Sequence, residues 1–217
     1  MPSYRQMLET AERWRELPGL ERVPAGVALT FDDGPDPDCT PAVLDALDAA
    51  GVRATFFVLG EQLMRNHAIA RDAAQRGHEL GLHGYEHADH DSLRPQAARD
   101  DLARALGSFE ASVGRRPRFF RPPYGRFSQA SYDACLHLGL EPVYWSQWGE
   151  DWEPIPADRV VDLASRDLAD GDIVLLHDST RYAHRPDCSA TAEAVAPIVA
   201  KAGELGLRVG PLGDLVA

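Results

Sequence analysis

The sequence predicts an α/β protein in which parallel strands are covered by helices. Seven short runs of apolar, β-branched or aromatic residues recur along the 217-residue chain. Most of them are separated by Ala-rich stretches with helical periodicity, and such alternation is typical of parallel sheets. The runs are almost continuously apolar, as expected of strands covered on both faces. An open doubly wound sheet and a barrel both fit this pattern.

The predicted strands are short and bounded by Gly, Pro or charged residues. In chain order they are GVALTF (26–31), ATFFVLG (54–60), HELGLH (78–83), RFFRP (118–122), PVYWS (142–146), GDIVLLH (171–177) and LRVGPL (207–212). The first run is not followed by a Gly-x-Gly-x-x-Gly pattern, so the sequence gives little support to a dinucleotide site.

The first predicted helices have recognisable starts. Residues 1–20 are expected to contain an amphipathic helix, because apolar side chains share one helical face. These are Tyr4, Met7, Leu8, Ala11 and Trp14. The next helix is expected to begin with Thr40 as its N-cap and Pro41 at its first position, and to end at Gly51.

The later helices are predicted from the same signals. Two of them span about 61–76 and 95–113, each followed by glycine. The last helix is less regular, because Pro197 must either start it or kink it. The loop 178–190 is the longest irregular stretch, and such loops often border a site.

Composition limits the classes of partner and the compartment. Lys and Arg number 22 against 34 Asp and Glu, a formal net charge of −12, which argues against nucleic acid or an anionic membrane as the main partner. No signal-peptide pattern or membrane span is apparent, so the chain as given predicts a cytoplasmic protein, with secretion left open if it is a piece of a longer chain. Three widely spaced cysteines predict a reduced protein without a disulfide framework. The oligomeric state is not predicted.

Polar side chains gather where the predicted strands end. They are Asp32 and Asp33, His83 and His87, Arg121, Asp151 and Trp152, and His177 and Asp178. In barrels and open sheets alike, the loops after the carboxyl ends of the strands build the site. Each residue alone has an ordinary reading: a solvated turn, a chance His pair, a structural ion pair or core packing. Together they supply the inventory of a metallohydrolase at one edge of the sheet.

Five ordered motifs carry a resemblance to a known family. The stretches TFDDG, H-x-x-x-H, RPPYG, DW and IVLLHD closely resemble the polysaccharide deacetylase family, also called carbohydrate esterase family 4 or the NodB-homology domain. The resemblance covers 27–215 within a single domain of residues 1–217. It implies a distorted, incomplete (β/α)7–8 barrel and metal-dependent N-deacetylation of amino sugars.

The resemblance also implies a metal and a base. Asp33, His83 and His87 would bind one divalent ion, with zinc expected first and cobalt, nickel or manganese as alternatives. Asp32 would act as general base, and Arg121 would orient it. The metal would compensate the charge of Asp33 beside its like-charged neighbour.

The remaining roles follow from the same resemblance. His177 would be the general acid, supported by Asp151, and the backbone N–H of Tyr124 would stabilise the oxyanion. Leu175 and Trp152 would line a pocket for the acetyl methyl group. Gly84 and Trp148 depart from the family motifs, where Ser or Thr and Asp are usual. Trp148 is either a sugar-stacking platform or core packing.

The expected partner is a carbohydrate that bears N-acetyl groups, such as a chitin oligomer, peptidoglycan or a related glycan. A second interpretation keeps the chemistry and replaces the substrate with an acetamido or formamido group on a small amino sugar or metabolite. A third is a carbohydrate-binding protein that does not catalyse. Loss of a ligand, base or acid would favour the third, and the sequence retains all of them.

Overall fold

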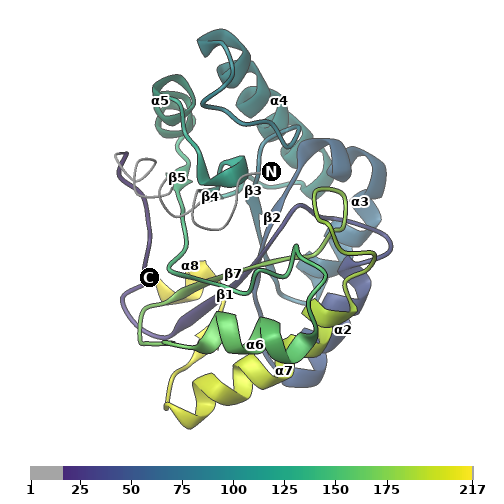
Figure 1. Ribbon diagram of the computed structural model, residues 1–217. Coiled ribbons are helices and arrows are strands. Elements are labelled where there is room, and N and C mark those ends of the chain that lie inside the picture. Colours follow the sequence, from purple (N-terminus) through teal and green to yellow (C-terminus); the bar gives the residue numbers. More distant parts are fainter. Residues whose placement is uncertain (1–16, 217) are drawn as a thin grey trace.

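The computed structural model describes residues 17–216, which form one parallel sheet surrounded by helices (Figure 1). Eight strands pair in the order β5-β4-β3-β2-β1-β7-β6, and β8 pairs with β1. Their bounds are β1 Val27–Asp32, β2 Thr55–Val58, β3 Glu79–Leu82, β4 Phe119–Phe120, β5 Glu141–Pro142, β6 Gln147–Trp148, β7 Ile173–His177 and β8 Val209–Gly210.

Helices connect most of the strands. They are α2 Thr40–Ala50, α3 Gly60–Gln75, α4 Pro95–Val113, α5 Gln129–His137, α6 Ala157–Ser165, α7 Ser189–Glu204 and α8 Leu212–Leu215. The predicted ends at Gly51 and Gly114 are confirmed, since both residues adopt the left-handed conformation that glycine allows. Pro197 lies inside α7 rather than at its start.

The sheet curls into an incomplete barrel, which confirms the predicted fold class. Its two edge strands, β5 and β6, share no ladder among the described residues. The chain between them, residues 143–146, passes from one edge to the other, and Val143 forms a bridge with Leu20 on the way. The run PVYWS is therefore not one strand: only Pro142 belongs to β5, and β6 begins after the run has ended.

The two faces of the sheet carry different sets of side chains. Along β1, Leu29 and Phe31 belong to the large core beneath the helices, while Ala28 belongs to a smaller cluster with Phe57 and Ile173. Thr30 and Asp32 follow Ala28 on this second face, because side chains alternate along a strand. The concave face of the sheet is thus apolar at its base and polar at the strand ends.

Two predictions on the N-terminal part and the cysteines need comment. Residues 1–16 of the predicted N-terminal helix lie outside the described residues, and residues 17–20 are not helical. The expectation of a protein without disulfides is wrong, because Cys39 and Cys188 are joined. They lie immediately before α2 and α7, two helices that pack together, and this proximity is not visible in their separation of 149 residues.

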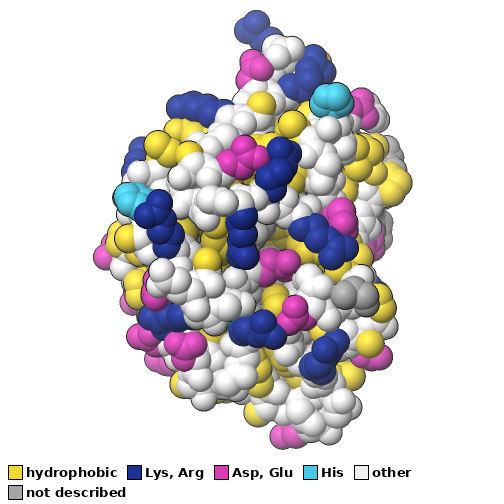
Figure 2. Space-filling model, turned by 180° about the vertical axis from the view of Figure 1, so that it is seen from behind, with side chains coloured by type: hydrophobic (Ala, Val, Ile, Leu, Met, Phe, Trp, Pro, Cys, Tyr) yellow, Lys and Arg dark blue, Asp and Glu magenta, His cyan; other side chains and the backbone are white. Residues whose placement is uncertain are grey.

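Figure 2 shows one face of the molecule, on which no single kind of charge dominates. On the face seen in Figure 2, basic side chains are interspersed with acidic and apolar ones. Within residues 17–216, no helix combines the length and the apolar character needed to cross a membrane.

Candidate active site

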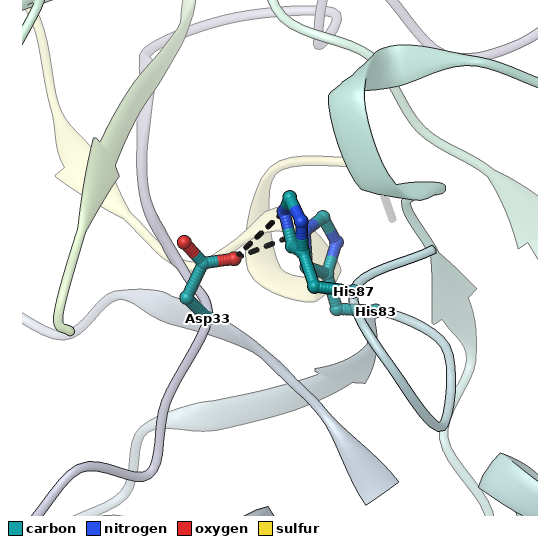
Figure 3. A group of neighbouring side chains, drawn as sticks. All are labelled: Asp33, His83 and His87. Carbon is teal, nitrogen blue, oxygen red and sulfur yellow. Dashed lines mark ion pairs between the residues drawn. The ribbon is translucent and has the colours of Figure 1, made fainter. Parts of the chain in front are cut away.

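Asp33, His83 and His87 converge at the carboxyl end of the sheet (Figure 3). Asp33 Oδ1 lies 3.3 Å from His83 Nε2 and 3.3 Å from His87 Nε2. One ligand atom from each residue lies within 4.8 Å of the others. Apart from these two ring nitrogens, the buried Oδ1 has no hydrogen-bonding partner among the described residues. The predicted ligand set is therefore brought together.

The orientation and electrostatics of the triad suit a divalent metal. His83 Nδ1 lies 2.8 Å from the carbonyl oxygen of Arg121 and donates to it, which fixes the ring so that Nε2 is the nitrogen presented to Asp33. Burial lowers the pKa of His87 to about 4. Burial alone raises the pKa of Asp33, but the His87 and His83 rings outweigh it and hold the pKa well below its usual range. Two imidazoles and a carboxylate fit a catalytic zinc site that keeps an open position.

Two residues at the site have backbone conformations that residues other than glycine rarely adopt. Asp33 has a φ of 84° and Tyr124 a φ of 59°, both in the left-handed region. Gly34 follows Asp33, and a Cβ atom there would collide with the carboxylate of Asp178. Residues held in such conformations often belong to functional sites. The strand β1 ends at Asp32, and Asp33, in the left-handed conformation, places its carboxylate against His83 and His87.

Arg121 and Asp32 form a buried pair beside the triad. Arg121 Nη1 lies 2.7 Å from Asp32 Oδ1 and donates to Thr30 Oγ1 at 2.9 Å, while Nη2 donates to the Tyr144 carbonyl oxygen at 2.8 Å. The guanidinium is fully buried, and desolvation lowers its pKa despite the neighbouring Asp32. Asp32 Oδ2 lies 3.9 Å from His83 Nε2. The arginine thus fixes one carboxylate oxygen and leaves the other facing the triad.

His177 and Asp151 form the second pair. His177 Nδ1 lies 2.8 Å from Asp151 Oδ1, and the His177 backbone N–H donates to Asp151 Oδ2 at 2.9 Å. Burial lowers the pKa of His177, but the charge of Asp151 and its hydrogen bond outweigh burial and raise the pKa to about 9. His177 therefore carries a proton on both ring nitrogens at neutral pH.

The other predicted residues surround these groups. The Tyr124 ring meets the His87 ring edge-on, with centroids 4.4 Å apart, and Trp152 meets His177 in the same way at 5.5 Å. Leu175 lies two residues before His177 on β7 and therefore shares its face of the sheet. Trp148, on the edge strand β6, is the register partner of Leu175.

Sequence reasoning missed two residues in the loop 178–190. The Tyr182 ring stacks on the His87 ring with centroids 4.2 Å apart, and its hydroxyl donates to Glu61 Oε1 at 3.0 Å. Arg185 Nη1 lies 3.3 Å from Asp151 Oδ2, and its Nη2 donates to the His177 carbonyl oxygen at 2.8 Å. The length of the loop was the available signal, but neither contact follows from a motif.

The geometry agrees with the outcome of comparisons with known proteins. A model of the family described as polysaccharide deacetylase matches residues 21–143. The chain belongs to the polysaccharide deacetylase family. It is 33% identical over 203 residues to a peptidoglycan-N-acetylglucosamine deacetylase of Bacillus cereus, covering 93% of this chain and 91% of the relative. It is also 33% identical over 196 residues to a chitooligosaccharide deacetylase of a Bradyrhizobium species, covering 87% and 90%.

Solved structures support the same assignment. The crystal structure of the peptidoglycan N-acetylglucosamine deacetylase Bc1960 superposes with a TM-score of 0.81 at 28% identity, covering 88% of this chain and 90% of that one. A pseudoenzyme of carbohydrate esterase family 4 from Bacillus anthracis superposes with a TM-score of 0.80 at 26% identity, covering 88% and 65%. The family and the enzyme class that the sequence predicted, hydrolases of the polysaccharide deacetylase family, are confirmed.

Proposed function

We propose that the chain is a metal-dependent N-deacetylase of glycans that contain N-acetylglucosamine. The observation that carries this proposal is that the Asp33, His83 and His87 triad shares one end of the sheet with a fixed carboxylate and a protonated imidazole. Asp32, fixed by Arg121, faces the triad with its other oxygen, and the protonated His177 is the register partner of Asp32 on the next strand. A base, a metal site and an acid in one cluster are the components of metal-assisted amide hydrolysis.

Asp33, His83 and His87 would hold the ion, with zinc expected first and cobalt, nickel or manganese as alternatives. A divalent ion bound there would polarise the acetyl carbonyl and make water a stronger nucleophile at neutral pH. Asp32 Oδ2 is the oxygen that Arg121 leaves free, so it would accept the proton of the attacking water. The new C–O bond forms as this proton moves to the carboxylate.

His177 would complete the reaction as the general acid. Because Nδ1–H is held by Asp151, the proton on Nε2 is the one available to the leaving nitrogen. Its transfer lets the C–N bond break and releases acetate and the amino sugar. The backbone N–H of Tyr124 would stabilise the developing oxyanion, and Leu175 and Trp152 would enclose the acetyl methyl group. Trp148, on the edge strand, would extend this wall.

Two observations bear on the substrate. The relatives in both organisms are named for glycans of N-acetylglucosamine, which supports a peptidoglycan or chitooligosaccharide substrate. The Cys39–Cys188 disulfide is typical of oxidising compartments, and it favours a glycan outside the cytoplasm over a small cytoplasmic amide. The complete set of ligands, base and acid favours catalysis over a binding role like that of a pseudoenzyme.

Acetate release tests the proposal. Chelator-treated protein is incubated with N-acetylglucosamine oligomers of graded length and with peptidoglycan fragments, with and without zinc or cobalt. We expect release only with added metal and a rate that rises with oligomer length. Release from a small acetamido sugar alone would favour the second interpretation, and no release from any substrate with any metal would overturn the proposal.

A further inference from the structure

The segment that joins the two histidine ligands has an unusual opening. Gly84, directly after His83, has a φ of 98°, a conformation that favours glycine. A Cβ atom at this position would lie 3.0 Å from Asp101 Oδ2. The carboxylate of Asp101, which projects from α4, therefore lies in tight contact with the position that a Cβ atom at residue 84 would take.

Asp101 is fully engaged with this segment. Its Oδ2 accepts a hydrogen bond from the Tyr85 backbone N–H at 3.0 Å, and its Oδ1 accepts one from the Glu86 backbone N–H at 3.1 Å. His90 Nε2 lies 3.1 Å from Oδ2 and donates to it, because an ionised carboxylate only accepts. One side chain thus receives three hydrogen bonds from residues on both sides of His87.

The same segment is held from a second helix. The backbone N–H of Gly60, at the start of α3, donates to the Gly84 carbonyl oxygen at 2.9 Å, and the N–H of Glu61 donates to the Tyr85 carbonyl oxygen at 3.0 Å. These bonds satisfy amides that a helix start leaves without partners. Asp101 supplies what α3 cannot, an acceptor for the amides of the segment.

We propose that Asp101 is a positioning residue that, together with His90, fixes the segment 84–90 and presents His87 to the metal. The inference rests on the metal site of the proposed function. It gives His90 a role as a donor within the support of the site rather than as a ligand. Gly84 itself has no side chain to bond the segment, and the carboxylate of α4 bonds it from outside.

The test compares Asp101→Ala and Asp101→Asn with Asp100→Asn. Asp100 is the neighbouring residue on α4, is exposed and accepts a hydrogen bond from Gln96, so its variant is a matched control. Zinc affinity is measured by competition with a chromophoric chelator. Hydrogen exchange of the Tyr85 and Glu86 amides is measured by NMR on metal-free protein. We expect Asp101→Ala to weaken zinc binding about 10- to 100-fold, as for other residues that support metal ligands, and to speed exchange of both amides.

The outcomes separate this inference from the proposed function. Asp101→Asn keeps the shape of the side chain and one acceptor oxygen, so we expect a smaller loss of affinity, and it replaces Asp101→Ala if that variant does not fold. Unchanged affinity in folded Asp101 variants, or equal losses in Asp100→Asn, would overturn the positioning role. If the wild type bound no metal, the metal assignment would fail, and the exchange rates alone would decide whether Asp101 fixes the segment.

Discussion

Asp32 and His177 are register partners on the neighbouring parallel strands β1 and β7. Their side chains therefore leave the same face of the sheet side by side. Each is fixed by a buried group of opposite charge, Arg121 at 2.7 Å and Asp151 at 2.8 Å. The pairing of two strands thus sets the distance between the proposed base and acid, and the two buried partners set their orientation.

The adjacent aspartates are expected to respond differently to substitution. Asp33→Ala removes the carboxylate ligand of the triad, so we expect loss of both bound metal and activity. Asp32→Asn keeps the shape of the side chain but cannot accept the proton, so we expect metal to be retained and kcat to fall by about 10²- to 10⁴-fold. Metal content and kcat of the two purified variants check this division.

A matched control lies in the same loop. Asp38 is exposed and uses its backbone N–H to bond the Asp36 side chain, so Asp38→Asn changes the local charge without touching the triad. We expect its metal content and kcat to stay near those of the wild type. Loss of metal in Asp32→Asn would reverse the assignment of the two carboxylates.

The pair of His177 and Asp151 predicts a pH dependence. Because the pKa of His177 is raised on folding to about 9, its stabilisation is complete below its ordinary pKa of about 6.5 and is lost as pH rises through 9. Asp151→Asn removes the largest source of this stabilisation, while the smaller contributions of Asp33 and Asp32 remain. We expect the variant to be less stable than the wild type at pH 6 and the gap to narrow above pH 9. Urea unfolding of the metal-free proteins across this range measures the gap.

The same change bears on catalysis. His177 must be protonated to act as an acid, so the alkaline limb of the pH–rate profile should move to lower pH in Asp151→Asn. Glu153→Gln is the control, because Glu153 pairs with the exposed His184 at 3.0 Å. An alkaline limb that stayed in place in Asp151→Asn would remove His177 from the role of general acid.

Sequence patterns predicted the parts of the structure that depend on neighbours along the chain. The glycines after α2 and α4 marked the helix ends, and the strand ends supplied the polar residues of the site. The ligand triad was predicted from the resemblance of its motifs to the polysaccharide deacetylase family, since the spacing of His83 and His87 alone also fits a chance pair. These signals are local, so a single chain displays them.

Contacts between distant segments could not be predicted in the same way. Two of these contacts, the stacking of Tyr182 on His87 and the Cys39–Cys188 disulfide, depend on the position of the loop before α7 relative to distant parts of the chain. The strand β6 was missed because a strand of two residues is too short to show a periodic pattern. It forms only because residues 143–146 carry the chain from one edge of the sheet to the other. Asp101 was hidden for another reason: an acidic residue on a helix surface usually signals only solvent exposure.

Replacing Arg121 is expected to lower both the stability and the activity of the protein. Removing one partner of a buried ion pair leaves the other charge uncompensated and typically costs about 3–5 kcal/mol. Arg121→Ala would leave the buried Asp32 carboxylate without its partner charge and the Tyr144 carbonyl oxygen without this donor. We therefore expect the free energy of unfolding in urea to fall by this amount. Arg121→Lys keeps the charge but not the fork of donors, and we expect it to recover part of the stability and little of kcat.

The control for Arg121 lies three residues earlier. Arg118 pairs with Glu141 at 2.8 Å, but both side chains are about half exposed. Arg118→Ala should therefore change the free energy of unfolding by less than about 1 kcal/mol. Equal losses in the two Ala variants would contradict the view that the buried pair anchors the base.

Because of the disulfide, we expect reductant to lower the stability of the protein. It closes a loop of 149 residues, and removing a native cross-link typically lowers stability by about 2–5 kcal/mol. We expect reductant to lower the stability of the wild type to that of the Cys39→Ser, Cys188→Ser double variant in urea unfolding. The double variant is its own control, because its remaining thiol, Cys135, is buried and unpaired with another cysteine. A wild type that reductant left unchanged would mean that the two cysteines are not joined in solution.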